Sequence, residues 1–158
     1  MNPTFSAPMR ALIVGAVALS AVAAQAQEQQ KSPGERAVEY RQAVFTVMAS
    51  NFGPVNNMAS GKAPYDAASV TKHSQRAAEM AKMLDDAFPA DSDGVAKTKA
   101  KPEIWKKSDD FKKDYQSLVD KTDALAAAAK SGDQAKVKTA ANDVAGACKA
   151  CHDDFRAK

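Results

Sequence analysis

The stretch VKTAANDVAGACKACHDDF, Val137–Phe155, has the most regular apolar pattern in the chain. Its small and apolar positions follow one another in alternating steps of four and three residues, at Val137, Ala141, Val144, Cys148, Cys151 and Phe155. This spacing is typical of the inward seam of a helix in a bundle. The stretch therefore predicts a C-terminal helix that turns both of its cysteines toward the core.

Three further stretches have helical periodicity, and nothing in the sequence reads as a strand. The first starts at the capping signal Ser32-Pro33-Gly34-Glu35, and we expect Gly53-Pro54 to weaken or kink it. The second should start at Asp66 and end at Phe88, before Pro89. The third should be capped by Asp or Ser near Ser108 and end at Gly132. With Asp133 capping the last helix, the pattern predicts an all-α protein, an antiparallel up-down-up-down four-helix bundle.

The predicted core is built from small side chains, because only 6% of the residues are aromatic and alanine is abundant. The inward positions of the first three helices are Val38, Arg41, Phe45, Met48 and Phe52; Val70, Ala77, Ala81, Leu84 and Phe88; and Phe111, Tyr115, Leu118, Thr122, Leu125 and Ala129. A further group filling this core would explain the small residues, and Ala140, Ala141 and Ala145 are expected to leave room for it. The one long loop, residues 89–102, has a length that is usually functional or disordered.

The N-terminus has the pattern of a secretory signal. Arg10 precedes an apolar run, Ala11–Ala21, that is too short to span a bilayer, and Ala24-Gln25-Ala26 fits a cleavage site. We therefore predict a cleaved signal peptide over residues 1–26 and a single domain over residues 27–158, 158 − 26 = 132 residues long. Export places this domain in the periplasm, without a membrane anchor after processing.

The charge of the chain argues against a nucleic-acid partner. The 22 Lys and Arg residues and 19 Asp and Glu residues are interspersed and give a net charge of only +3. Nucleic-acid binding calls for a basic stripe, which the sequence lacks.

The only two cysteines lie in Cys148-Lys149-Ala150-Cys151-His152, and four kinds of chemistry use such a pair. A disulfide would close a very small, strained loop within one helix. A redox-active pair normally lies at a helix N-terminus in a βα unit, whereas this pair lies near a helix C-terminus. A zinc site would need further ligands, and only His73 and scattered carboxylates are available.

Covalent haem attachment fits the C-x-x-C-H spacing and the oxidising compartment best. Thiols at positions i and i+3 lie on one helical face, where they match the two vinyl groups at a porphyrin edge. His152 then projects toward the iron as its axial ligand. We therefore predict one covalently bound haem c per chain, held by Cys148 and Cys151. On the opposite side Met48 is a candidate ligand, since methionine is common there, while His73 lies among polar neighbours and is a weaker candidate.

These residues give the chain a resemblance to the cytochrome c′ family. It extends over the whole mature chain and is carried by AVEYRQAVFTVMASNFG (Ala37–Gly53), GKAPYDAA (Gly61–Ala68), KPEIW (Lys101–Trp105) and CKACHDDFR (Cys148–Arg156). Haem attachment alone is common to many cytochromes. Its position at the end of a four-helix chain, together with the Arg41-Gln42 pair, is more specific.

The resemblance implies a homodimeric bundle in which Arg41 and Gln42 lie against the haem, with Arg41 as a partner for a propionate. Snorkelling of Arg41 to the surface is the alternative from pattern alone. The residue over the iron is then Phe45, which cannot ligate, so the iron is expected to be high-spin and five-coordinate. Arg156 is expected near His152, and Trp105 either covers the haem edge or fastens the long loop. The dimer faces of this family suggest Ala37, Val44 and Val47 as interface candidates.

An open, apolar site implies binding of NO and CO, with nitric oxide sequestration or transport as the function and electron transfer to a periplasmic partner as a possible second role. The alternative is a low-spin electron-transfer cytochrome in which Met48 binds the iron. We do not expect an enzyme, because the inward face of the first helix has no histidine, arginine or carboxylate placed for acid–base catalysis above the iron.

Overall fold

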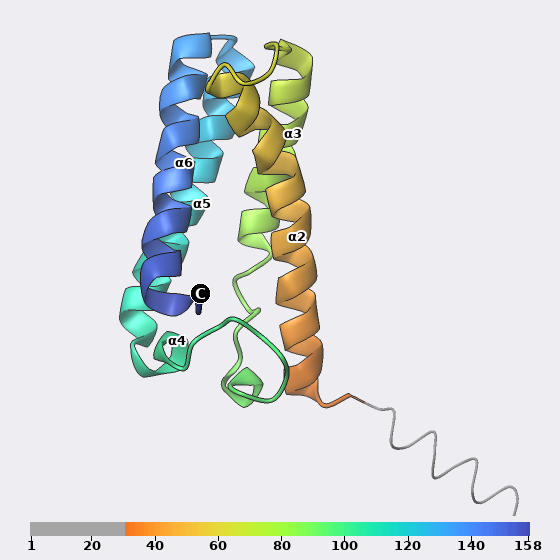
Figure 1. Cartoon of the computed structure of the whole chain (residues 1–158), viewed down its shortest axis with the longest axis vertical. Coiled ribbons are helices and arrows are strands. Elements are labelled where there is room, and N and C mark those ends of the chain that lie inside the picture. Colours follow the sequence, from red (N-terminus) through yellow and green to blue (C-terminus); the bar gives the residue numbers. More distant parts are fainter. Residues whose placement is uncertain (1–30) are drawn as a thin grey trace, which may run out of the picture. The chain divides into compact units, whose positions relative to one another are not determined.

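Five α-helices and one short 3₁₀ turn form the described part of the chain, residues 31–158 of a computed structural model; the predicted signal peptide lies outside these residues. The elements are α2 (Pro33–Ala59), α3 (Ala67–Lys82), η1 (Ala90–Ser92), α4 (Glu103–Lys106), α5 (Ser108–Ser131) and α6 (Gln134–Phe155). The four long helices run alternately up and down (Figure 1). The predicted all-α, antiparallel four-helix bundle is confirmed.

Three of the predicted helix-boundary signals are confirmed, those at Asp66, Gly132 and Asp133. The Asp66 carboxylate accepts a hydrogen bond from the Ser69 N–H, and that of Asp133 accepts from the N–H groups of Ala135 and Lys136. Gly132 ends α5 with a φ of 71°, a left-handed conformation that glycine adopts without strain. The predicted Ser or Asp cap of α5 is wrong, because the N-cap position is Lys107 and no side chain caps it.

Helix α2 continues through Gly53-Pro54, the point at which the sequence predicts a weakening or kink. Pro54 lacks the N–H that would bond four residues back, which costs the helix stability. The turns that follow contribute Val55, Met58 and Ala59 to the buried core. Burial of these side chains offsets the missing hydrogen bond, so the helix reaches Ala59.

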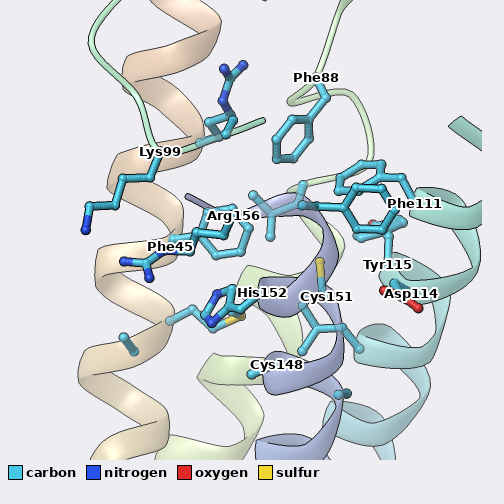
Figure 2. Close-up of a pocket in the computed structure, with 18 of the residues that line it drawn as sticks. Phe45, Phe88, Lys99, Phe111, Asp114, Tyr115, Cys148, Cys151, His152 and Arg156 are labelled. Carbon is cyan, nitrogen blue, oxygen red and sulfur yellow. The ribbon is translucent and has the colours of Figure 1, made fainter. Parts of the chain in front are cut away.

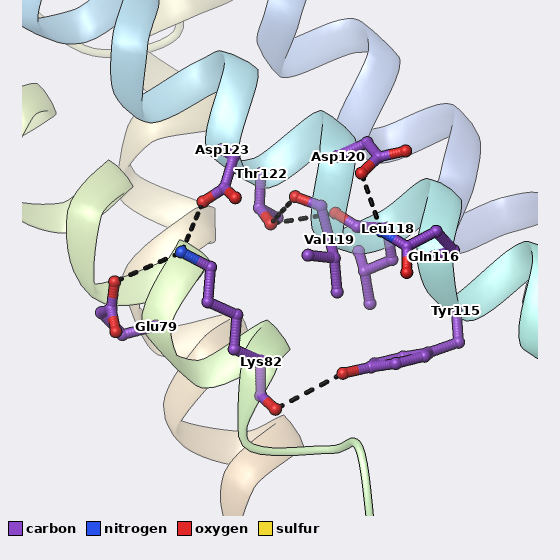
Figure 3. A network of polar contacts seen from close by, with 9 residues as sticks. All are labelled: Glu79, Lys82, Tyr115, Gln116, Leu118, Val119, Asp120, Thr122 and Asp123. Carbon is purple, nitrogen blue, oxygen red and sulfur yellow. Dashed lines mark hydrogen bonds and ion pairs between the residues drawn. The ribbon is translucent and has the colours of Figure 1, made fainter.

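Helix α3 is shorter than its periodicity predicts. It ends at Lys82, and residues 83–87 continue as turns, although Leu84 and Ala87 remain buried. Two tyrosine hydroxyls donate to carbonyls at this end. Tyr115 donates to Lys82 at 3.4 Å (Figure 3), and Tyr40 donates to Met83 at 2.8 Å. Carbonyls in the last turn of a helix lack partners within it, so these side chains allow the chain to leave the helix here.

Charged side chains also join α3 to α5 at this level. Lys82 Nζ lies 2.9 Å from the Asp123 carboxylate and 3.6 Å from that of Glu79 (Figure 3). All three side chains are largely exposed, so these ion pairs contribute little to the free energy of unfolding. Apolar burial along the bundle is the larger contribution.

The inward faces of the helices agree closely with the predicted ones, with one correction on α2. Val44, an interface candidate from the sequence, is 5% exposed and packs against Leu84 and Ala87 of the same chain. It is therefore not available to a partner subunit. Val47, three residues on, is 47% exposed.

Arg41 is 2% exposed, so it does not snorkel to the surface. One guanidinium nitrogen donates to the Ser92 hydroxyl at 2.8 Å and to the Ala87 carbonyl at 3.3 Å, and another donates to the Ser92 carbonyl at 3.3 Å. The rings of Phe88 and Trp105 lie 4.9 and 5.7 Å from the guanidinium carbon. These contacts fix the segment after α3 against α2.

The 3₁₀ turn η1 approaches α2 so closely that only glycine fits at position 34. A Cβ atom on Gly34 would lie 2.1 Å from the Asp91 carbonyl oxygen and 2.7 Å from its carbon. Both are backbone atoms and cannot rotate away. Gly34→Ala should therefore lower the free energy of unfolding by about 2 kcal/mol or more, measured by urea denaturation.

Gly146→Ala is the matched control. It lies inside α6, and no atom within 4 Å opposes a Cβ there. Alanine is the better helix former, so this change should raise the free energy of unfolding by up to about 1 kcal/mol. Equal effects of the two substitutions would contradict the close approach of η1 to α2.

Candidate functional site

A cavity of about 660 Å³ opens at the end of the bundle where α2, α5 and α6 meet the long loop. Its apolar lining includes Phe45, Met48, Phe88, Phe111, Leu118 and Phe155. Protein interiors are close-packed and hold few voids larger than a water molecule. A cavity of this size in so small a bundle is within the range of a binding site for a small molecule or cofactor.

Cys148 and Cys151 both line the cavity from α6, and both are free thiols that are half-buried (Figure 2). Burial raises the pKa of the Cys148 thiol. Burial, with the nearby Asp114 carboxylate as a further cause, raises the pKa of Cys151 to about 11. Both thiols are therefore protonated near neutral pH. A redox-active pair needs the opposite shift, toward thiolate, so this environment does not suit one.

His152 lines the same cavity, next to Arg156 (Figure 2). The His152 side chain is exposed overall, but its partial desolvation, followed by the charge of Arg156, lowers the pKa of His152. Both effects favour the neutral imidazole, which is the form that binds a metal. The predicted attachment residues Cys148 and Cys151 and the predicted axial ligand His152 are thus brought together on one wall.

The opposite wall comes from α2 and contains both residues that the sequence placed above the iron. Phe45 is half-buried and Met48 is 8% exposed, and each lines the cavity. Phe45 begins a chain of edge-to-face aromatic contacts, with ring centroids 6.5 Å apart to Phe88, then 4.8 Å to Phe111 and 5.3 Å to Phe155. This chain surrounds the end of the cavity.

The other predicted pocket residues differ in their placement. Arg41 and Gln42 line the cavity, but the guanidinium of Arg41 also holds the segment around Ser92, and Gln42 Nε2 donates to the Lys97 carbonyl at 3.0 Å. Trp105 is not part of the lining. Its indole N–H donates to the carbonyls of Phe88 and Pro89, each at 3.2 Å, so of its two predicted roles the structure supports fastening the loop.

One sequence expectation about the surroundings is corrected, and His73 lies where its polar neighbours predict. Ala140, Ala141 and Ala145 do not line the cavity; the alanines that do are Ala49, Ala77, Ala100 and Ala147. The reason is that the cavity lies one to two turns nearer the C-terminus of α6. His73 lies outside the lining, where its Nδ1 is 2.9 Å from the Asn51 side-chain oxygen.

Within residues 31–158, no three His, Cys, Asp or Glu side chains gather in a way that would hold a metal ion. The zinc interpretation of Cys148 and Cys151 therefore lacks its remaining ligands.

Sequence reasoning missed two kinds of lining residue. Lys99 and Ala100 reach the cavity from the long loop, and no periodic signal marks loop residues. Asp114 lines it from α5, where burial, followed by the charges of Asp154 and Asp110, raises its pKa. Asp114 could have been predicted from the helical periodicity, because it lies between the inward residues Phe111 and Leu118.

The comparisons with known proteins agree with this geometry. The family described as Cytochrome C′ matches residues 36–156. The chain belongs to the cytochrome c′ family. It is 40% identical over 128 residues to cytochrome c′ from Rubrivivax gelatinosus, an alignment that covers 81% of this chain and 98% of that protein.

Solved structures of the family share the bundle. The crystal structure of the Rubrivivax gelatinosus protein aligns with a TM-score of 0.76 at 40% identity, over 82% of this chain and 100% of that chain. A nitric oxide complex of a cytochrome c prime variant from Alcaligenes xylosoxidans aligns with a TM-score of 0.73 at 38% identity, over 82% of this chain and 99% of that chain.

Membership of the cytochrome c′ family implies a c-type haem, and the cavity fits one. Two protonated thiols and an imidazole converge on an apolar space that the chain itself leaves unfilled. Thiols three residues apart on α6 face the same space, as thioether formation to both sides of a porphyrin edge requires.

The raised pKa of Cys151 predicts a pH dependence in the haem-free protein. In a Cys148→Ser variant, which leaves Cys151 as the single thiol, alkylation by iodoacetamide at pH 7 should be roughly a hundredfold slower than for a thiol of ordinary pKa 9. The rate should rise about tenfold for each pH unit up to about pH 11, because the thiolate is the nucleophile. A rate that levels off near pH 7 would instead indicate an activated redox cysteine.

Proposed function

We propose that this chain is a periplasmic c-type haem protein that binds nitric oxide at an open iron site and sequesters or carries it. One haem c would be attached through Cys148 and Cys151, with His152 as its axial ligand. When bound, the haem supplies an iron with one position free for a diatomic ligand. The observation that carries the proposal is the wall facing α6, where Phe45 offers a ring that cannot ligate.

The polar groups around the cavity support a preference for NO and CO over O₂. Bound O₂ is favoured by a hydrogen-bond donor in the distal pocket. The hydroxyls of Thr46, Tyr115 and Thr122 line the cavity, but each donates to a main-chain carbonyl: Thr46 to Gln42, Tyr115 to Lys82, and Thr122 to Leu118 and Val119. These three hydroxyls are already engaged, so none of them is free to donate to a bound ligand.

The same lining supports a binding protein rather than an enzyme. On α2 the cavity-lining residues nearest Phe45 are Thr46, Met48 and Ala49, none of which transfers protons near neutral pH, and the guanidinium of Arg41, one turn earlier, is bound to Ser92 and Ala87. Acid–base catalysis above the iron would need a histidine, arginine or carboxylate there. Nitric oxide complexes are known for variants of the related cytochrome c prime from Alcaligenes xylosoxidans, which adds to the case for this ligand.

Ligand entry above the iron requires Phe45 to move, because its ring packs between the two core clusters of the bundle. This obstruction should slow binding from the α2 side. We therefore also propose that NO attacks from the side of His152, beside Arg156, and that the bond to His152 is lost. Equilibrium NO binding with His152 still bound would contradict this step.

A six-coordinate electron-transfer cytochrome is the second candidate, because Met48 also lines the cavity. Its thioether would occupy the position that the main proposal leaves free. Met48 belongs to the core cluster with Val55 and Ala77, which explains its inward position without a bond to iron. An open site with Phe45 over it is therefore the better supported of the two.

Export and assembly complete the proposal. Cleavage after Ala26 would release the domain into the periplasm, and none of the helices described here is long and apolar enough to cross a membrane. We propose a homodimer, with Val47 and Ala37 on α2 remaining as interface candidates now that Val44 is buried. N-terminal mass spectrometry of the exported protein and sedimentation velocity test these two points.

Optical and EPR spectra of the purified protein distinguish the two candidates. An open site predicts high-spin signals in the oxidised and reduced states and a new nitrosyl spectrum on addition of NO. A low-spin spectrum with a sulfur-to-iron band would place Met48 on the metal and reject the gas-binding proposal. Met48→Leu should leave the spectra unchanged if the site is open.

Phe45→Leu should speed CO binding to the reduced protein. The substitution removes the aromatic contact to Phe88, worth about 1 kcal/mol, so the association rate should rise roughly fivefold to tenfold. Flash photolysis measures this rate. Phe52→Leu is the matched control, about two turns along α2, and should change the rate far less. An unchanged rate in Phe45→Leu would mean that Phe45 does not control entry.

A further inference from the structure

Residues 97–101, which we name the strap, run from the α2 side of the cavity to the end of α6. Lys99 and Ala100 of the strap line the cavity together with His152 and Arg156 (Figure 2). The long loop is thus ordered where it passes this site. The contacts at its two ends indicate what it does.

At its far end the strap pairs with the residues that follow α6. The Lys101 N–H donates to the Phe155 carbonyl at 3.0 Å, and the Ala157 N–H donates to the Lys99 carbonyl at 2.8 Å. Together they form an antiparallel bridge between Ala100 and Arg156. The last residue of α6 and its C-cap are therefore held by backbone hydrogen bonds from outside the helix.

Lys101 adds a side-chain contact to the same place. Its ammonium donates to the Asp154 carbonyl at 2.7 Å and to the Asp153 carbonyl at 3.3 Å. Carbonyls at a helix end lack partners within the helix and carry partial negative charge. The sequence places two carboxylates, Asp153 and Asp154, at this negative end, which the helix dipole disfavours. Lys101 supplies both the missing donor and the compensating charge.

At its near end the strap is fastened to α2, because Gln42 Nε2 donates to the Lys97 carbonyl at 3.0 Å. The strap therefore connects the helix that carries Phe45 to the turn that carries His152. Among the neighbouring pairs of long helices, α2 and α6 have the least direct contact with each other, and this link joins them.

His152 depends on this support more than a buried ligand would. A metal-binding histidine usually donates its second ring N–H to a fixed partner, which sets the orientation of the ring. His152 is exposed, and among residues 31–158 no hydrogen bond to its ring is found. The position of its imidazole therefore follows from the backbone of the last turn of α6.

We propose that Lys101 is a positioning residue for His152: through the strap and the cap on α6 it fixes the imidazole that binds the iron and limits its release. The proposal rests on the proposed function for the identity of the iron ligand. In the proposed reaction NO attack beside Arg156 breaks the bond to His152, so loosening this turn should favour that outcome. No role for Lys101 follows from its place in the sequence, since it lies in a loop before Pro102.

Lys101→Met tests the proposal in the haem-loaded protein, with Lys112→Met as the matched control on the exposed face of α5. Loss of two charge-assisted hydrogen bonds should speed amide hydrogen exchange at Ala157 and Lys101 by about tenfold. The iron–histidine stretching band of the reduced protein, recorded by resonance Raman spectroscopy, should shift to lower frequency. Lys101→Arg should restore both, because arginine can also donate to these carbonyls.

A second variant tests the same support of α6 in case Lys101→Met does not fold. Ala157→Pro removes the N–H that bonds the Lys99 carbonyl, and it lies beyond the last helix. The preceding residue, Arg156, has φ −123° and ψ 129°, which a following proline accepts. This variant should also shift the iron–histidine band.

The outcomes separate this proposal from the proposed function. If Lys101→Met speeds amide exchange but leaves the iron–histidine band unchanged, Lys101 is a structural cap alone and the proposal is overturned. Unchanged amide exchange in Lys101→Met would also overturn it. A shifted band in Lys101→Met and Ala157→Pro, but not in Lys112→Met, supports it. Amide exchange and the iron–histidine band are both measured without NO. If the wild-type protein fails to bind NO, the proposed function is rejected, and the iron–histidine band still decides the role of Lys101.

Discussion

The buried guanidinium of Arg41 is the contact on which the cavity end of the molecule depends. A buried charge is costly unless hydrogen bonds satisfy it, and Ser92 and Ala87 accept from Arg41. Burial lowers the pKa of Arg41, and the charge of Asp93 opposes that shift; arginine nevertheless remains protonated in proteins. The segment after α3 must therefore fold against α2 to satisfy the charge.

The rest of the long loop follows from this anchor. Phe88 and Trp105 lie on the guanidinium, and the Trp105 indole donates to the carbonyls of Phe88 and Pro89. The loop is held at both ends, so residues 97–101 reach the end of α6. The cavity is thereby bounded by the long helices, by the cluster of phenylalanine rings and by the ordered loop. Its two thiols and its imidazole all come from α6.

Much of the site could be predicted from the sequence because it lies on helices. The steps of four and three residues placed Cys148 and Cys151 on the inward seam, and His152 followed directly. The same periodicity placed Phe45 and Met48 on the facing helix. It failed at Val44 and at the end of α3, since partners from other helices decide both: Leu84 and Ala87 bury Val44, and two tyrosine hydroxyls satisfy carbonyls that would otherwise continue the helix.

The sequence by itself determined the four helices, the seam that carries the thiols and imidazole, and the family. These features are encoded in patterns a few residues long, which the geometry of a helix converts directly into a face. Only the tertiary structure decided that Arg41 anchors the loop, that Trp105 fastens it, and that Lys101 caps α6. The Arg41–Ser92 and Lys101–Asp154 contacts join residues 51 and 53 positions apart. Contacts at that separation have no local signal, because they form only when the packed bundle brings the segments together.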